Sequence, residues 1–267
     1  MQLDKDQNHI LQLSDIHLGE NYGGKFDTKD TFDRTIAHAS SIKPSGGFDA
    51  VVITGDIADP EGPVDNYLYV LKSVKALCNR NYNIFVTPGN HDNREKLRKA
   101  YCMATGNVDE GNEFLTPGMQ FKMAKFGSKM IVLIDTGDGV PFEGMLRLSR
   151  YAYDQGDHFH AADTLLFTHK PFKSEGNLYH RFMKDNMLPN KMSGDLCRYI
   201  AGYFCGHLHH ATRFDAAFPV YVAPAIQTQI DPYRKEFDAI VIPGYNIISF
   251  NTYSNSTVSV HTVFVED

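Results

Sequence analysis

The stretch Asp49-Ala-Val-Val-Ile-Thr-Gly-Asp-Ile-Ala-Asp59 joins a run of apolar residues directly to a cluster of polar ones. The apolar run over 49–54 predicts a strand that is buried on both faces, as in a parallel sheet. The polar residues 55–59 then predict a loop at the carboxyl end of that strand. Because ligand sites in open α/β sheets form at the carboxyl ends of the strands, this stretch indicates both a fold class and the place of a site.

The same arrangement occurs before and after this stretch. Residues 9–13 predict a strand that ends in Ser14-Asp15-Ile16-His17, and residues 83–87 predict one that ends in Pro88-Gly89-Asn90-His91-Asp92. Apolar residues at helical spacing follow each strand, over 27–42, 64–78 and 93–103. Strand, loop and helix therefore occur three times in succession, which predicts an α/β fold with a mainly parallel sheet.

The second half of the chain is less regular. We expect a hairpin that turns at Gly127-Ser128, a strand that ends at His169, and a strand that ends at Gly206-His207-Leu208-His209. The segments 136–162 and 172–197 show no clear period, so we expect loops or partial helices there. The strands predicted in this half cover 121–126, 129–135, 164–168, 199–205, 218–224, 239–242, 246–252 and 257–265.

Composition narrows the class of protein. The chain has 267 residues, 42% of them hydrophobic, so we expect a single domain over 1–267. The net charge of −6 argues against binding to nucleic-acid backbone, although a nucleotide substrate stays open because bound metal ions would reverse the local charge. Residues 1–9 are polar and no apolar run reaches the roughly 18 residues of a membrane span, so we expect a cytoplasmic protein without membrane contact.

Four cysteines occur, and none belongs to a C-x-x-C pair. We therefore expect buried free thiols in a reducing compartment, rather than disulfides or a thiolate metal site. They are Cys78, Cys102, Cys197 and Cys205.

Five predicted strands end in Asp, Asn or His, and these side chains should meet at one edge of the fold. Imidazole and carboxylate ligands suit zinc, iron and manganese. The set holds more donors than one tetrahedral ion needs, which indicates two ions about 3.5–4 Å apart with Asp56 as the bridging carboxylate. Taken singly, each cluster is explained as a turn or a helix cap, so the hypothesis depends on all of them: Asp15, His17, Asp56, Asp59, Asn90, His91, Asp92, His169, His207 and His209.

In this order the clusters resemble the calcineurin-like metallophosphoesterase superfamily, with the motifs D-x-H, G-D-x-x-D, G-N-H-[DE], a lone H, and G-H-x-H over positions 15–209. The resemblance implies an α/β fold, a four-layer α-β-β-α sandwich with two central mixed sheets. It implies two divalent metal ions, Mn, Fe, Zn or Co. The first would be held by Asp15, His17, Asp56 and His209, and the second by Asp56, Asn90, His169 and His207.

The resemblance also assigns roles to residues around the ions. Asn90 and His91 would bind the substrate, and His91 would contact the phosphate or protonate the leaving group. Asp92 would orient His91 through a hydrogen bond. A hydroxide that bridges the two ions would attack phosphorus, and no P-loop is present to support an ATPase.

Within the superfamily, the sequence is most similar to the class III cyclic nucleotide phosphodiesterases. The segments that carry this similarity are Gly55–Asp59, Cys205-Gly206-His207, Ala223-Pro224-Ala225 and Pro243-Gly244-Tyr245. The expected substrate is a small phosphodiester, cyclic nucleotide or other. A protein or nucleotide phosphomonoesterase is the alternative, ahead of a nuclease or a non-catalytic scaffold. Tyr233 and Tyr245 could stack on a base, although core positions are the more ordinary interpretation.

Overall fold

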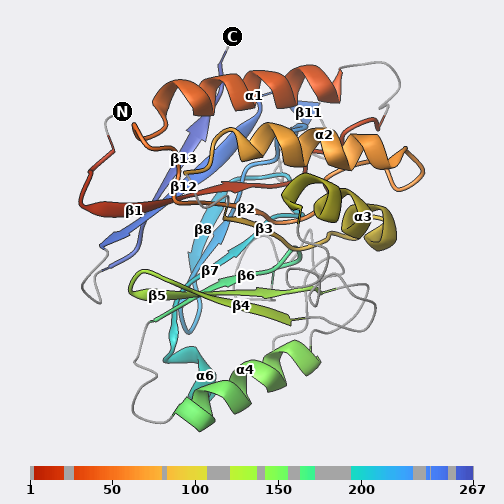
Figure 1. Cartoon of the computed structure of the whole chain (residues 1–267). Coiled ribbons are helices and arrows are strands. Elements are labelled where there is room, and N and C mark those ends of the chain that lie inside the picture. Colours follow the sequence, from red (N-terminus) through yellow and green to blue (C-terminus); the bar gives the residue numbers. More distant parts are fainter. Residues whose placement is uncertain are drawn as a thin grey trace.

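The apolar runs of the sequence form the strands of two mixed β-sheets in the computed structural model (Figure 1). The structure describes residues 3–20, 27–79, 83–106, 121–136, 142–155, 163–171, 194–230, 239–240, 242–251 and 257–266. The first sheet has the order β13-β12-β1-β2-β3. Its strands are β1 (Gln7–Leu13), β2 (Ala50–Ile53), β3 (Ile84–Val86), β12 (Gly244–Asn251) and β13 (Ser259–Phe264).

The second sheet has the order β4-β5-β6-β7-β9-β8. The strands that lead into the predicted site are parallel to their neighbours. In the first sheet β1 pairs with β2 and β2 with β3, and in the second sheet β6 pairs with β7. The strands of the second sheet are β4 (Phe121–Phe126), β5 (Lys129–Ile134), β6 (Thr164–Phe167), β7 (Ile200–Cys205), β8 (Thr212–Asp215) and β9 (Pro219–Val222), and a separate pair is formed by β10 (Gln229–Ile230) and β11 (Ala239–Ile240).

Helices cover the outer face of each sheet. Figure 1 shows α1, α2 and α3 on the side of the first sheet and α4 and α6 on the side of the second. The two sheets lie between these helix layers, so the predicted four-layer α-β-β-α sandwich is confirmed. The helices are α1 (Thr28–Ile42), α2 (Val64–Lys75), α3 (Arg94–Thr105), α4 (Phe142–Gln155) and α6 (Gly194–Cys197).

Alternating side chains of the second sheet divide between two cores. In β5, Ile131 and Leu133 join the apolar cluster of the first sheet, whereas Val132 and Ile134 join the cluster that contains Leu148 of α4. This follows from the two-residue period of a strand, which sends successive side chains to opposite faces. The strand β5 is therefore buried on both faces.

Several elements differ from the sequence-based expectation. In the segments where we expected loops or partial helices, 136–162 contains a regular helix, α4, and 172–197 contains the short helix α6. The strands β8 and β10 were not predicted, and residues 172–193 lie outside the described part. The four cysteines are free, as expected, but only Cys205 is fully buried. Among the described residues, no helix is long and apolar enough to cross a membrane.

Candidate metal centre

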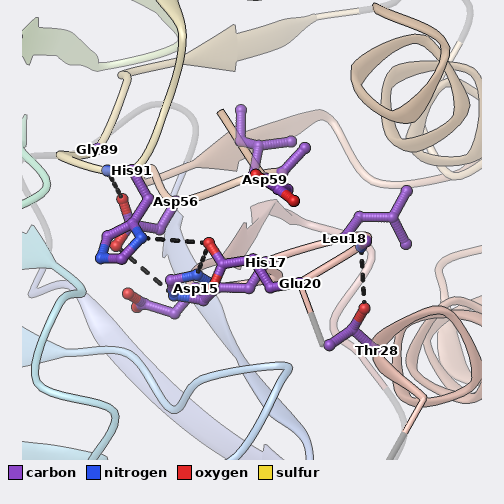
Figure 2. A network of polar contacts seen from close by, with 12 residues as sticks. Asp15, His17, Leu18, Glu20, Thr28, Asp56, Asp59, Gly89 and His91 are labelled. Carbon is purple, nitrogen blue, oxygen red and sulfur yellow. Dashed lines mark hydrogen bonds and ion pairs between the residues drawn. The ribbon is translucent and has the colours of Figure 1, made fainter. Parts of the chain in front are cut away.

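The loops after β1, β2, β3, β6 and β7 bring the predicted ligands together at the carboxyl ends of the strands. Two groups have donor atoms that all lie within 4.8 Å of one another, Asp15 with His17 and His209, and Asp56 with His169 and His207. Figure 2 shows Asp15 and His17, from the loop after β1, converging with Asp56 from the loop after β2. Sequence reasoning therefore placed these side chains correctly on one rim.

In the first group, the ring nitrogens point toward a shared space. His17 Nε2 lies 3.1 Å from His209 Nε2, and His209 Nε2 lies 3.5 Å from Asp15 Oδ1. His209 Nδ1 is 3.1 Å from the Thr228 carbonyl oxygen. Because a carbonyl only accepts, Nδ1 carries the proton and Nε2 keeps a free lone pair for a ligand bond.

The second group is built in the same way. His169 Nδ1 donates to the Thr54 carbonyl oxygen at 2.7 Å, which leaves the lone pair of Nε2 available. That Nε2 lies 3.1 Å from Asn90 Oδ1 and 3.2 Å from Asp56 Oδ2. His207 Nδ1 is 3.2 Å from the same nitrogen. Asn90 thus joins the group as its fourth donor.

Asp56 lies between the two groups. Its Oδ2 is 3.2 Å from His169 Nε2 and 3.6 Å from His17 Nε2. Its Oδ1 accepts the backbone N–H of His91 at 2.9 Å. This hydrogen bond leaves Oδ2 as the oxygen that faces both sets of rings, which is the arrangement a bridging carboxylate requires.

These residues fit a bound divalent cation. Two close pairs join ring nitrogens, His17 Nε2 with His209 Nε2 and His169 Nε2 with His207 Nδ1, and each pair needs either a shared proton or a cation between its lone pairs. Ligands that lie ~2.1 Å from one ion are separated by about 3.0–3.4 Å at octahedral or tetrahedral angles, close to the observed spacings. His207 Nε2 is also buried without a hydrogen-bond partner among the described residues. Donor type, spacing and this unpaired nitrogen therefore agree with a metal centre.

Asp56 dominates the electrostatics of the proposed site. Burial opposes its charged form, but His169 and then His17 lower the pKa of Asp56 below its usual range. Burial also lowers the pKa of His169, yet Asp56 outweighs burial and raises it to about 9. Burial and the nearby His169 lower the pKa of His207 to about 2, so this ring is neutral, the form in which imidazole binds metal.

The backbone of the site lies in an unusual conformation. Among the described residues, every non-glycine with positive φ is a predicted ligand. Asp15 and His17 both occupy the left-handed region, at φ 53° and 48°. Strain of this kind persists where the surrounding structure fixes it, and it concentrates at functional sites. The other three such residues are Asp56, His207 and His209.

His91 and Asp92 have separate polar partners in the structure. The carboxylate of Asp92 accepts the backbone N–H groups of Gly89 and Ile57, both at 2.8 Å. No hydrogen bond joins Asp92 to His91 among the described residues, and a role of Asp92 in orienting His91 stays a prediction. The ring of His91 instead lies 3.2 Å from Glu20, through Nδ1.

Glu20 was missed by sequence reasoning. Its Oε1 lies 2.9 Å from His17 Nδ1, and its side chain is only 13% exposed. The contact raises the pKa of His91. The available signal was an acidic residue three positions after the histidine of the D-x-H motif, next to a glycine that allows a tight turn.

Two other sequence expectations concern aromatic side chains. Tyr245 is fully buried in the core, and its hydroxyl lies 2.9 Å from His38 Nδ1, so it does not serve as a stacking platform. Tyr233 lies outside the described residues.

Comparison with known proteins gives consistent results. A protein 26% identical over 209 residues, which cover 76% of this chain and 72% of that one, is named as a probable glycerophosphodiester phosphodiesterase from Arcobacter nitrofigilis. A second, 24% identical over 235 residues with 86% and 84% of the two chains covered, is named as a probable cyclic nucleotide phosphodiesterase from Fibrobacter succinogenes.

Solved structures share the fold. TT1561 of Thermus thermophilus superposes with a TM-score of 0.57 at 11% identity, covering 97% of this chain and 99% of that one. The purple acid phosphatase PPD1 of yellow lupin gives 0.55 at 10% identity, with 98% and 52% covered. The model of the calcineurin-like phosphoesterase family matches residues 9–211, which contain every predicted ligand, and the chain therefore belongs to the calcineurin-like phosphoesterases.

Proposed function

We propose that this phosphoesterase is a phosphodiesterase that acts on a small diester with two divalent metal ions. The observation that carries the proposal is the position of Asp56 Oδ2 between two separate groups of donors. The two relatives above are both named as diesterases, and each aligns over most of its length, which favours a diester as the substrate.

Each proposed metal ion has its own ligands. Asp15, His17 and His209 would hold one ion, Asn90, His169 and His207 the other, and Asp56 both. When bound, two such ions activate water as a nucleophile and stabilise charge on the phosphoryl oxygens. The carbonyls of Thr54 and Thr228 keep a proton on Nδ1 of His169 and His209, so each ring presents Nε2 without rearrangement.

His91 suits a role toward the substrate. Its side chain is 44% exposed, whereas His17 and Asp56 beside it are buried. Its backbone N–H is bound to Asp56 Oδ1, which holds the backbone of His91 at the edge of the proposed centre. From there it would contact a phosphoryl oxygen or protonate the leaving oxygen.

Hydrolysis of bis-p-nitrophenyl phosphate and p-nitrophenyl phosphate, measured side by side, tests the proposal. The wild type, Asp56→Asn and the control Asp65→Asn, at an exposed position at the start of α2, would each be stripped of metal and reloaded with Mn²⁺. We expect the wild type to bind two equivalents and to favour the diester. Asp56→Asn should lower kcat at least about 100-fold, since it removes the shared ligand, and the control should not.

The other outcomes are equally informative. Faster turnover of the monoester would replace this proposal with a phosphomonoesterase. A single metal equivalent at saturation would contradict the two-metal centre. Metal binding without turnover of either compound would overturn the assignment as a general diesterase.

A further inference from the structure

The carboxylate of Glu20 contacts two histidines that belong to different motifs. Its Oε1 is 2.9 Å from His17 Nδ1 and 3.2 Å from His91 Nδ1. Figure 2 shows the Glu20 side chain between these two rings. The rings themselves pack edge to face, with centroids 5.0 Å apart and planes at 77°.

Glu20 lies on the side of His17 that faces away from the proposed metal ligands. The Nε2 atom of His17 points toward His209 Nε2 and Asp56 Oδ2, at 3.1 Å and 3.6 Å. The Nδ1 atom points toward Glu20. An imidazole that binds a metal through one nitrogen and a carboxylate through the other is held in one tautomer and one orientation.

The local backbone places Glu20 where this contact is possible. The Glu20 N–H donates to the His17 carbonyl at 3.0 Å, which closes a turn, and Gly19 within it has a φ of 91°. The Gly19 N–H donates to Thr28 Oγ1 at 3.0 Å, which attaches the turn to the first helix. A Cβ on Gly19 would lie 2.5 Å from Asn66 Nδ2, so any other residue there would displace that side chain as well as adopt a left-handed φ.

We propose that Glu20 is a positioning residue, which fixes the ring of His17 toward the metal centre and the ring of His91 toward the substrate. This inference rests on the proposed function, because it assigns Glu20 to the same centre. Through one carboxylate, Glu20 would link the orientation of a metal ligand to that of the group that meets the phosphate.

The alternative role of Glu20, as a direct metal ligand, predicts a different number of bound ions. Donor atoms of His17, Glu20 and His91 also lie within 4.8 Å of one another. If Glu20 were itself a metal ligand, these three side chains would bind an additional ion. The number of metal equivalents therefore separates the two roles.

The test uses the full chain as wild type, Glu20→Gln, Glu20→Ala and Glu61→Gln. Glu61 is exposed, and its substitution removes the same charge nearby without touching either histidine. Calorimetric titration with Zn²⁺ would give stoichiometry and affinity. Long-range ¹⁵N–¹H spectra of the Zn²⁺-loaded proteins would report the tautomer of His17 and His91. Hydrolysis of bis-p-nitrophenyl phosphate would give kcat and KM.

For Glu20→Gln we expect unchanged stoichiometry, a 10–100-fold weaker Zn²⁺ affinity, and a fall in kcat that exceeds any change in KM. Glu20→Ala should show the same changes and a second tautomer of His17, whereas Glu61→Gln should match the wild type. Glutamine preserves the shape of the side chain, so Glu20→Gln gives the answer if Glu20→Ala fails to fold.

Three results would overturn the inference. Unchanged affinity and tautomers in both Glu20 variants would mean that Glu20 positions neither ring. Loss of one metal equivalent in Glu20→Gln would make Glu20 a ligand. A loss of folding stability without change in affinity or spectra would make it structural only. In all three cases a wild type that binds at least two ions and hydrolyses the diester leaves the proposed function intact.

Discussion

Asp92 illustrates how a single buried side chain can support the site without touching the reacting groups. Its carboxylate accepts hydrogen bonds from the amides of Gly89 and Ile57, and a longer one of 3.4 Å from Ala58. Gly89 belongs to the loop after β3, and Ile57 to the loop after β2. Asp92 therefore joins the loop of Asn90 to the loop of Asp56, and this contact explains why an acidic residue is needed there.

Removal of that carboxylate should cost stability more than chemistry. In Asp92→Ala, buried amides lose their acceptor, and we expect the free energy of unfolding to fall by about 2–4 kcal/mol. Urea unfolding of the metal-free protein measures this, with Asp6→Ala at an exposed position as control. An unchanged free energy of unfolding together with a large loss of kcat would support the catalytic role predicted from the sequence.

The loops that follow the strands are strained elements held by each other. Left-handed backbone costs a non-glycine residue roughly 1–2 kcal/mol. The loop of Asp15 and His17 is fixed by backbone hydrogen bonds to the loop of Asp56, from Asp15 N to Gly55 O at 3.0 Å and from His17 N to Asp56 O at 2.9 Å. These bonds offset the strain, and they make the geometry of one ligand loop depend on its neighbour.

A substitution at Gly89 tests whether the geometry of one ligand loop depends on that of the neighbouring loop. A Cβ at this position would collide with the carboxylate and the amide nitrogen of Asp56. We expect Gly89→Ala to displace Asp56, to weaken Zn²⁺ binding by at least 10-fold, and to lower the free energy of unfolding by about 1–3 kcal/mol. Calorimetric titration and urea unfolding measure both effects.

Gly46→Ala is the matched control, since a Cβ there meets nothing within 4 Å. Wild-type affinity in Gly89→Ala would show that the loop of Asn90 moves independently of Asp56.

Some of these elements were predicted from the sequence and others were not, for physical reasons. The strands that lead into the site are continuous apolar runs that stop at polar residues, so the sequence predicted both the strand and its ligand loop. The sequence did not predict a regular helix at α4. Leu148 and Ala152 are buried on one face, but Tyr153 is 86% exposed, so the large apolar and aromatic residues do not follow a single helical period. Glu20 was missed because its partner His91 is distant in the sequence, and only the fold brings them together.

At the scale of the whole molecule, buried polar side chains connect the two sheets directly beneath the site. Gln12 of β1, fully buried, donates to the Cys205 carbonyl of β7 at 3.2 Å. It also donates to Thr54 Oγ1 at 3.2 Å and accepts from Asn246 Nδ2 at 3.0 Å. The loops that carry the proposed metal ligands come from both sheets, so their separation depends on how the sheets are joined.

Two substitutions of Gln12 separate hydrogen bonding from packing. Gln12→Leu keeps most of the volume but leaves the Cys205 carbonyl and the Asn246 amide without this partner, and we expect a loss of about 1–3 kcal/mol in the free energy of unfolding. Gln12→Ala adds a cavity and should lose more. The control is Gln7→Ala, on the same strand but only half-buried. Because Cys205 immediately precedes the Gly206–His209 loop, Gln12→Leu should also weaken Zn²⁺ binding, measured by calorimetry. Lower stability with unchanged affinity would show that the ligand loops hold their positions independently of the contact between the sheets.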